Sequence, residues 1–418
     1  MVFMDSEFYL IVCTVFLFIL AFGLVSNLTK EKLYLPETII SITFGILVGK
    51  YGLKIINTGY TDSKIIMYQF SRVVLCIQVM TVAMSLPHGY IYGHCFSLLI
   101  LIFLVSLLKY FISFCIVYMF SHYNVAVSLG IAACLTPTDP ILSSSILKSK
   151  FADENVPERL RLLLSAESGI NDGIGLALLY FPIDVLYSDS LYTGIYTFVT
   201  STLLYKCLFP ALLGALIGYL SRISLQYCYA RGMVGIESFL VYGLALTFFI
   251  LGLMAVLEAS ELICIFFTGT VFSWDEWFVL ETRESRLQEI TDSIFTSSFF
   301  VFFGSRIDFS KLSWKILLAA LLILTLRRML PCLLCYPLIP DVHSLREAAF
   351  IGWFGPIGVG ALFYSLQMDQ LLGTLTIDFV TPIVLASVFI HGLTIPIINL
   401  MRNKIESDEL SHIVPILK

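Results

Sequence analysis

Long apolar runs fill most of this chain, and short polar segments separate them. A helix needs about 20 apolar residues to cross a bilayer, and runs of roughly that length recur thirteen times. They lie near 8–26, 33–53, 66–86, 96–120, 124–147, 159–183, 191–221, 236–257, 260–273, 289–308, 313–336, 344–368 and 376–401. The pattern predicts an all-α polytopic membrane protein with about thirteen transmembrane helices. Because the ninth run is short, twelve crossings are the alternative.

The composition agrees with this pattern. Hydrophobic residues make up 58% of the chain, charged residues only 13%, and the mean hydropathy is +0.91. A soluble domain is about 25% charged. Formal net charge is −5 and no basic tract occurs, which argues against a nucleic-acid partner. The lipid bilayer is therefore the expected surroundings of the chain.

The positions of Lys and Arg in the loops predict the orientation, because cytoplasmic loops carry an excess of them. With the N-terminus outside, the inner loops and tail hold fourteen of these residues and the outer loops hold four. The inner set is Lys30, Lys32, Lys148, Lys150, Arg159, Arg161, Arg222, Arg231, Arg283, Arg286, Arg346, Arg402, Lys404 and Lys418, and the outer set is Lys50, Lys54, Lys64 and Lys311. We expect a cytosolic tail at 402–418 and, because no targeting signal is evident, the plasma membrane.

Two of the runs contain residues that interrupt a helix. The fifth holds Pro137 and Pro140 on either side of Asp139, and the twelfth holds Gly355, Pro356 and Gly358. Paired interrupted helices in two halves of a chain are a pointer to a transporter's midplane site. We therefore expect an inverted repeat, in which residues 1–183 form the first repeat, 191–221 a connecting span and 236–401 the second repeat.

Three carboxylates lie at membrane depth, where charge is costly and usually functional. They are Asp139, Glu167 and Asp172. At about 100° per residue, Glu167, Ser168, Asn171 and Asp172 fall within an arc of about 140° on one helix face. Hard cations prefer oxygen ligands. This face, with the unwound backbone near Thr138, predicts a Na⁺ site that includes Asp172 and Asp139.

Asp172 also has a second predicted use. Burial in an apolar site favours the neutral form of a carboxylate, so protons and sodium would compete for the same oxygens. Because Asn171 cannot ionise, we expect one proton to leave for each cation that binds. Glu167 would be costly as an isolated charge, and Arg327 and Arg328 in the eleventh run are its expected partners.

Other charged residues in the spans have simpler interpretations. Arg72 and Lys109 are expected to lie near span ends or to extend to the membrane interface. Glu261 is expected to be solvated at a span boundary. His391, in the last span, is the histidine that best fits a pH sensor.

These motifs together resemble those of the fungal-type Na⁺/H⁺ antiporters of the monovalent cation:proton antiporter superfamily. The strongest stretch runs from Pro157 to Gly173 and contains Glu167-Ser168-Gly169-Ile170-Asn171-Asp172. Thr138-Asp139-Pro140, Phe354-Gly355-Pro356-Ile357-Gly358-Val359, Arg327-Arg328 and Pro340-Asp341 support it. Two positions depart from the family pattern: Ser85 stands where fungal relatives usually have Glu, and Trp353 where some have His.

The resemblance implies an inverted-repeat fold with two crossed broken helices, a core domain and a dimerisation domain that forms a homodimer. It implies that Asp172 carries the ion and the proton, and that Thr138, Asp139, Ser168 and Asn171 shape the site. It also implies that Glu167 pairs with an arginine of the eleventh span, and that exchange is electroneutral.

The expected protein is therefore a secondary antiporter of Na⁺ or Li⁺, with K⁺ as the open alternative, against H⁺. It is not expected to be an enzyme or to need a cofactor. An intramembrane aspartyl protease would also place two aspartates on neighbouring spans, but neither Asp139 nor Asp172 lies in a Gly-x-Gly-Asp motif. A cation channel is the other alternative, although symmetric rings of ligands are typical of channel filters.

Overall fold

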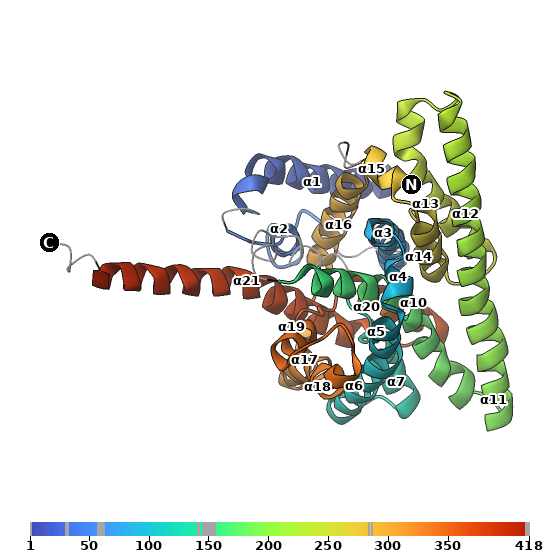
Figure 1. Cartoon of the computed structure of the whole chain (residues 1–418). Coiled ribbons are helices and arrows are strands. Elements are labelled where there is room, and N and C mark those ends of the chain that lie inside the picture. Colours follow the sequence, from blue (N-terminus) through green and yellow to red (C-terminus); the bar gives the residue numbers. More distant parts are fainter. Residues whose placement is uncertain are drawn as a thin grey trace.

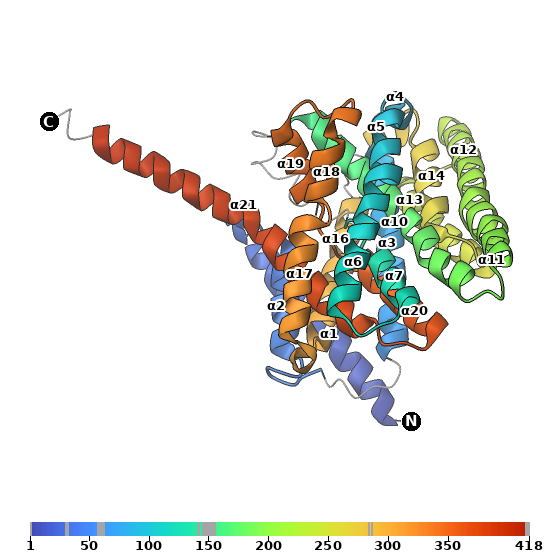
Figure 2. The same ribbon diagram turned by 90° about the horizontal axis from the view of Figure 1, so that it is seen from below.

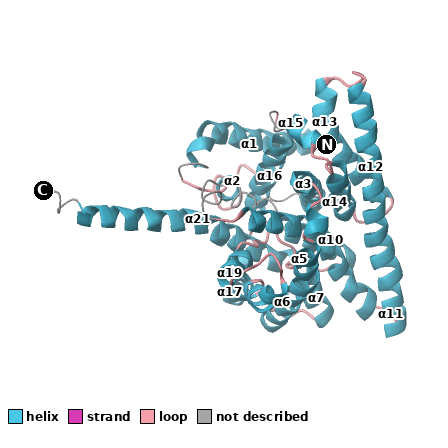
Figure 3. Cartoon of the chain, viewed as in Figure 1, coloured by secondary structure: helices cyan, strands magenta, loops and turns pink. Residues whose placement is uncertain are grey.

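The computed structural model describes residues 2–29, 33–56, 63–139, 143, 156–282, 285 and 287–413. These residues are nearly all helical and contain no strand (Figure 3). A helix overlaps each of the thirteen predicted runs, and within the described residues eight helices are long and apolar enough to cross a membrane by themselves. The all-α membrane fold is confirmed, whereas the count of thirteen crossings and the inverted repeat stay predictions.

The helical segments of the first half of the chain differ widely in length. They are α1 (Val2–Asn27), α2 (Glu37–Val48), α3 (Ser63–Ser85), α4 (Tyr90–Gly93), α5 (Cys95–Leu99), η2 (Ile100–Val105), α6 (Ser106–Phe120), α7 (Val125–Cys134) and α10 (Glu158–Leu186). A long helix follows in three parts, namely α11 (Leu191–Thr197), the π-helical η3 (Phe198–Leu208) and α12 (Phe209–Ala230).

The second half has more short helices. They are α13 (Ile236–Val256), α14 (Glu261–Phe272), α15 (Trp277–Thr282), α16 (Leu287–Arg306), η4 (Phe309–Lys311), α17 (Trp314–Leu326), α18 (Met329–Cys335), η5 (Tyr336–Leu338), α19 (Leu345–Trp353), α20 (Val359–Leu372) and α21 (Ile377–Ile413).

Five helices, α2, α3, α13, α14 and α16, pack against one another, and we call them the scaffold. Small residues allow close backbone contact between two of them, because the Cα of Gly304 on α16 lies against Gly45 on α2. In a bilayer, such small residues replace the hydrophobic effect as the basis of helix association. Buried phenylalanines of α16, among them Phe299 and Phe303, fill the space toward α3.

A second group, α6, α7, α10 and α17 to α21, forms what we call the core bundle. It lies below the scaffold in Figure 1 and is seen from beneath in Figure 2. Helices α3, α10, α14 and α20 form most of the contact between the two groups, and α2 also contacts α21. The long helix from α11 to α12 runs along one side of the molecule.

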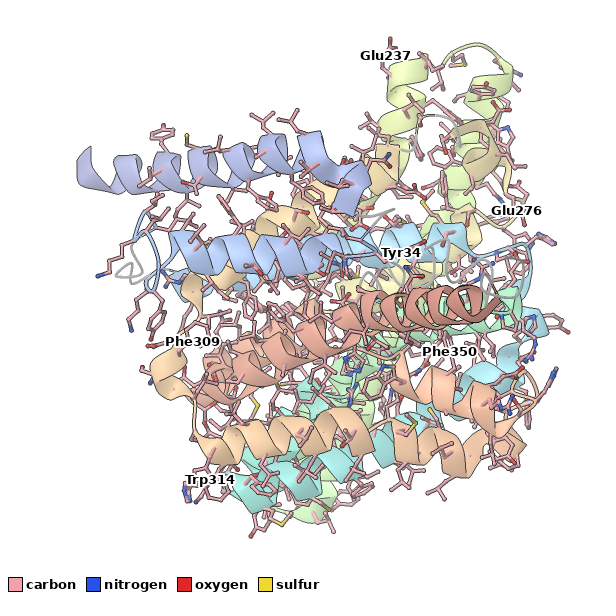
Figure 4. All side chains as sticks on the ribbon, turned by 90° about the vertical axis from the view of Figure 1, so that its left-hand side faces the viewer. Tyr34, Glu237, Glu276, Phe309, Trp314 and Phe350 are labelled. Atoms are coloured by element: carbon pink, nitrogen blue, oxygen red, sulfur yellow. The ribbon has the colours of Figure 1, made fainter. Side chains whose placement is uncertain are left out.

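The outer surface of the bundle is apolar, as lipid requires. Leu24 on α1, Leu212 on α12 and Leu334 on α18 are all largely exposed. Figure 4 shows that Phe309 and Trp314 lie toward one end of the bundle and Glu276 toward the other. Helix α16 lies between these two positions in the chain, because it begins eleven residues after Glu276 and ends three residues before Phe309.

A polar cluster at the end of the bundle where α10 begins joins the first turns of α5, α10 and α19 to the loop that holds Asp341. The Asp341 carboxylate accepts hydrogen bonds from Ser97 and from His94 Nδ1, the latter at 2.9 Å. Arg159 donates to the Asp341 carbonyl and to Glu347. We call these five residues the Asp341 cluster. Burial by itself would raise the pKa of Asp341, but its hydrogen bonds outweigh this and lower it.

Among the described residues, three of the predicted spans contain a break between helical segments. In the predicted fifth span, α7 ends at Cys134 and the chain is non-helical to Asp139, while Pro140 and most of the rest of that run lie outside the described residues. In the twelfth span, residues 354–358 separate α19 from α20. The third interruption, at Arg327 and Arg328 between α17 and α18, was not predicted.

Candidate ion-binding site

The two predicted broken segments meet. The Asp139 amide donates to the carbonyl of Pro356 at 2.9 Å, and the amide of Val359 donates to Asp139 Oδ2 at 3.0 Å. Because Val359 is the first residue of α20, the Asp139 carboxylate lies at a helix N-terminus, which favours negative charge. A β-carbon at Gly358 would overlap this carboxylate, so only glycine fits there.

The unwound segment after α7 is tied to α10 by side chains of the Ser168–Asp172 motif. The Thr138 amide donates to Asn171 Oδ1 at 3.2 Å, and Asn171 Nδ2 donates to Thr138 Oγ1 at 2.8 Å. Ser168 Oγ lies 2.9 Å from the same Thr138 oxygen. All three residues are buried. Asn171 therefore holds the unwound backbone in place. An amide suits this position because it both accepts a hydrogen bond from the Thr138 amide and donates one to the Thr138 hydroxyl.

Asp172 has a different environment from the other site residues. It is 1% exposed, and neither carboxylate oxygen has a hydrogen-bond partner. No other carboxylate of the described residues has both of its oxygens buried and unpartnered. A β-carbon built on Gly360 would lie 2.9 Å from Asp172 Oδ1, so α20 closes over one side of the carboxylate. Tyr364 donates its hydroxyl to the Asp172 carbonyl.

Glu167, five residues before Asp172 on α10, is fully buried. Arg328 binds both of its carboxylate oxygens, at 2.7 and 2.6 Å. Lys109 Nζ on α6 lies 3.4 Å from Oε1 and is also fully buried. This cluster joins α6, α10 and the break between α17 and α18, and such buried charges are stable only when paired.

Arg327 does not bind Glu167, although it is equally buried. Its guanidinium donates to the carbonyls of Leu135, at the end of α7, and of Gly355, just after α19, the latter at 2.8 Å. Both carbonyls belong to helix C-termini, where a cation is favourable. Arg327 thus neutralises the two C-terminal ends at the crossing, and Asp139 neutralises the N-terminal end of α20.

Two expectations from the sequence are wrong. Lys109 does not reach an interface, because it is fully buried against Glu167. Glu261 is not a solvated carboxylate, because it is 7% exposed and pairs with Arg72 at 2.6 Å. The signal for Lys109 was present in the sequence: a cation in the middle of an apolar run is as costly as a carboxylate.

The structure brings the predicted site residues together in one buried region. Asp139, Thr138, Ser168, Asn171 and Asp172 surround the crossing, and their oxygens provide the hard ligands that a small monovalent cation prefers. His391 is 2% exposed and its Nδ1 lies 2.9 Å from the Ser387 carbonyl, so it is a core side chain outside this set of oxygens.

Comparison with known proteins places this geometry in a family. A family model described as "Sodium/hydrogen exchanger, transmembrane" matches residues 15–400. The chain belongs to the sodium/hydrogen exchanger family. The Na(+)/H(+) antiporter 2 of Zygosaccharomyces rouxii is 33% identical over 422 residues, which cover 91% of this exchanger chain and 51% of that protein. The Na(+)/H(+) antiporter of Saccharomyces cerevisiae is 33% identical over 420 residues, which cover 91% and 42%.

The exchanger chain thus spans about half the length of these two relatives or less. Among solved structures, that of the sodium proton antiporter MjNhaP1 from Methanocaldococcus jannaschii at pH 8 aligns with a TM-score of 0.69 and 18% identity, over 94% of this chain and 96% of that one. The match confirms the predicted fold class. Neither a channel nor an intramembrane protease finds support in these comparisons.

Proposed function

We propose that the chain is a secondary active antiporter that exchanges Na⁺ for H⁺ across a membrane, with Asp172 carrying each ion in turn. The observation that supports this most directly is the buried Asp172 carboxylate, which has no hydrogen-bond partner at either oxygen. A bare carboxylate in such a place is very unfavourable. A bound proton or a bound cation removes that cost, and because both use the same oxygens, one excludes the other.

The neighbouring charges explain how the swap can occur without disturbing the fold. Glu167 keeps Arg328 and Lys109, Asp139 keeps the Val359 amide, and all of these partners are independent of the ion on Asp172. We take Thr138, Ser168 and Asn171 to hold the unwound backbone so that its oxygens complete the cation site.

The stoichiometry follows from the number of groups that can ionise. Asn171 cannot take part, so one carboxylate exchanges one proton for one cation, and the loaded site has the same net charge in both states. A transmembrane potential of 100 mV is worth about 2.3 kcal/mol per net charge moved, and this term vanishes for a one-for-one swap. Each pH unit then balances one decade of sodium gradient, about 1.4 kcal/mol apiece.

The proposal also includes the transported cation, the orientation of the chain and the membrane in which it lies. Na⁺ is favoured because the similar fungal proteins are named Na(+)/H(+) antiporters, with Li⁺ and K⁺ as the cations to compare. The distribution of Lys and Arg supports an outside N-terminus and a cytosolic C-terminus. We propose that a homodimer in the plasma membrane exports cytosolic sodium and contributes to pH homeostasis.

The test uses the purified chain in proteoliposomes with an internal pH dye and an acidic lumen. Addition of external Na⁺ should raise the internal pH, at a rate that does not change when valinomycin and K⁺ clamp the potential. Asp172→Asn should lose this response, whereas Asp189→Asn, at an exposed carboxylate beyond the end of α10, should keep it. If Asp172→Asn transports Na⁺ at the wild-type rate, the assignment of Asp172 is wrong. A sodium-driven current at symmetric pH would exclude one-for-one exchange.

A further inference from the structure

The long helix that connects the two halves of the chain changes its hydrogen-bond pattern in the middle. Between α11 and α12, the eleven residues of η3 are π-helical. Local residues account for this: the β-branched residues Val199, Thr200 and Thr202 are poor α-helix formers, and Thr200 Oγ1 donates to the Tyr196 carbonyl one turn back. Pro210, just after η3, has no amide hydrogen to donate. Prolines and π-segments are the usual sites of helix bending.

The first part of the connecting helix, from α11 to Thr202 within η3, is attached to α10, the helix that carries Asp172. Thr202 Oγ1 donates to Asp184 Oδ2 on α10 at 2.7 Å. Gly194 lies against the backbone of Asp184 and Val185, where a β-carbon would come within 2.8 Å. This half of the helix therefore follows α10 in any movement of the core bundle.

After the change, the same helix is attached to α14 of the scaffold. Thr268 on α14 donates its hydroxyl to the Gly214 carbonyl at 3.0 Å. Gly214 and Gly218 lie so close to α14 that a β-carbon at either would overlap its backbone. Figures 1 and 2 both show α12 beside α14 along the edge of the molecule. The α12 half is therefore fixed to the scaffold.

Lys206 lies where the connecting helix passes from its contact with the core bundle to its contact with the scaffold. Its ammonium lies 3.7 Å from the ring centre of Tyr180 on α10. Its carbonyl accepts a hydrogen bond from the amide of Ser260 at the start of α14, at 3.2 Å. In an α-helix that carbonyl would be paired with the amide of residue 210, which Pro210 lacks. Lys206 therefore contacts both groups at once.

The direct contact between α10 and α14 is close. Gly169 and Gly173 of α10 lie against the side chains of Phe266 and Ile263 of α14, so α10 contributes no side chain of its own at these two points. A cavity of about 430 Å³ lies next to it, and Tyr180, Lys206, Ser260 and Tyr364 are part of its lining. Any displacement of α10 along α14 must be taken up where the connecting helix changes partner.

We propose that η3, with Lys206 as its pivot, is the hinge about which the core bundle moves against the scaffold during exchange. This inference rests on the proposed antiport function, since alternating access requires such a movement. The change of hydrogen-bond pattern in η3 and the missing amide at Pro210 make the segment the most easily bent part of the connecting helix. The charge on Lys206 is not itself needed, because its carbonyl and its position define the pivot.

The experiment restores the missing amide with Pro210→Ala. The new N–H can pair with the Lys206 carbonyl in competition with Ser260 and stiffen the helix. In the proteoliposome assay, the maximal exchange rate should fall at least about fivefold, equal to ~1 kcal/mol in the barrier, while the half-saturating Na⁺ concentration stays within about twofold. Pro396→Ala is the matched control, because Pro396 is a buried proline within α21, a helix of the core bundle that is not part of the connecting helix.

Two results would overturn the hinge: a wild-type maximal rate for Pro210→Ala, or a change confined to the half-saturating concentration. If Pro210→Ala does not accumulate as folded protein, the double variant Val199→Leu/Thr200→Leu raises α-helical propensity in the same segment and has the same expected outcome. Failure of the antiport proposal itself is distinguishable, because wild-type protein would then give no exchange at all.

Discussion

Three substitutions around one buried carboxylate test the charge cluster of the core bundle. Glu167→Gln leaves Arg328 and Lys109 with no counter-charge. Arg328→Gln leaves Glu167 with Lys109 alone, at 3.4 Å. Lys109→Gln leaves both hydrogen bonds from Arg328 to Glu167, at 2.6 and 2.7 Å, intact. The expected order of destabilisation is therefore Glu167→Gln, then Arg328→Gln, then Lys109→Gln.

The magnitudes follow from what each change strands. Removing one partner of a buried pair costs ~3–5 kcal/mol, and Glu167→Gln should lie at the upper end because it strands two cations. Lys109→Gln loses one long contact to a charged group but also removes a buried ammonium, so we expect about 1 kcal/mol or less. The double variant Glu167→Gln/Lys109→Gln should be more stable than Glu167→Gln alone, because one stranded cation has been removed.

The assay is thermal unfolding of the purified protein in detergent, together with the Na⁺ dependence of exchange. At ~2 °C per kcal/mol, Glu167→Gln should lower the melting temperature by about 10 °C. Lys315→Gln, at a partly exposed position near the start of α17, serves as the control for loss of a lysine. The reasoning is refuted if Lys109→Gln destabilises as much as Glu167→Gln, or if the effects of the two substitutions simply add.

Two further predictions concern the crossing and the loops. Gly358→Ala would push its new methyl group into the Asp139 carboxylate and should reduce exchange about 10- to 100-fold, by loss of a charge-assisted hydrogen bond. Gly252→Ala on α13, with open space around it, should exchange like the wild type. Equal activity of the two variants would contradict this prediction. The pKa of Asp341 is lowered in the folded state, so its contribution to stability is present above the unfolded value near 3.9 and is lost as pH falls through the folded value. The melting-temperature difference between wild type and Asp341→Asn should thus shrink as the pH falls below about 4, and a difference that grows in that range would be the contrary result.

Much of this chain's architecture could be predicted from the sequence, because a bilayer allows the backbone few conformations. Each apolar run must pair its own amides and carbonyls, so each forms a helix, and prolines and glycines mark where a helix is broken. The interruptions at Thr138–Asp139 and at 354–358 followed from those residues alone. The face that carries Ser168, Asn171 and Asp172 followed from helical periodicity.

The partners of the buried charges could not be predicted in the same way. Arg327 and Arg328 are neighbours in an apolar run, and only the fold directs one to the helix ends at the crossing and the other to Glu167. Lys109, which precedes Glu167 by 58 residues in the chain, joins the same cluster from α6. Nothing local distinguishes these cations, because their energy depends on which groups come close when the helices pack.

The state of Asp172 was likewise decided by the tertiary structure. The sequence placed a carboxylate at membrane depth, but the absence of any partner at its two oxygens depends on α20 closing over it at Gly360. The change of partner along the connecting helix depends on both α10 and α14. The hydrophobic pattern determines the helices because it acts along one segment of the chain. The pairing of charges in a buried core needs atoms from several segments at distances of about 3 Å. Only the packing of the helices brings those atoms together.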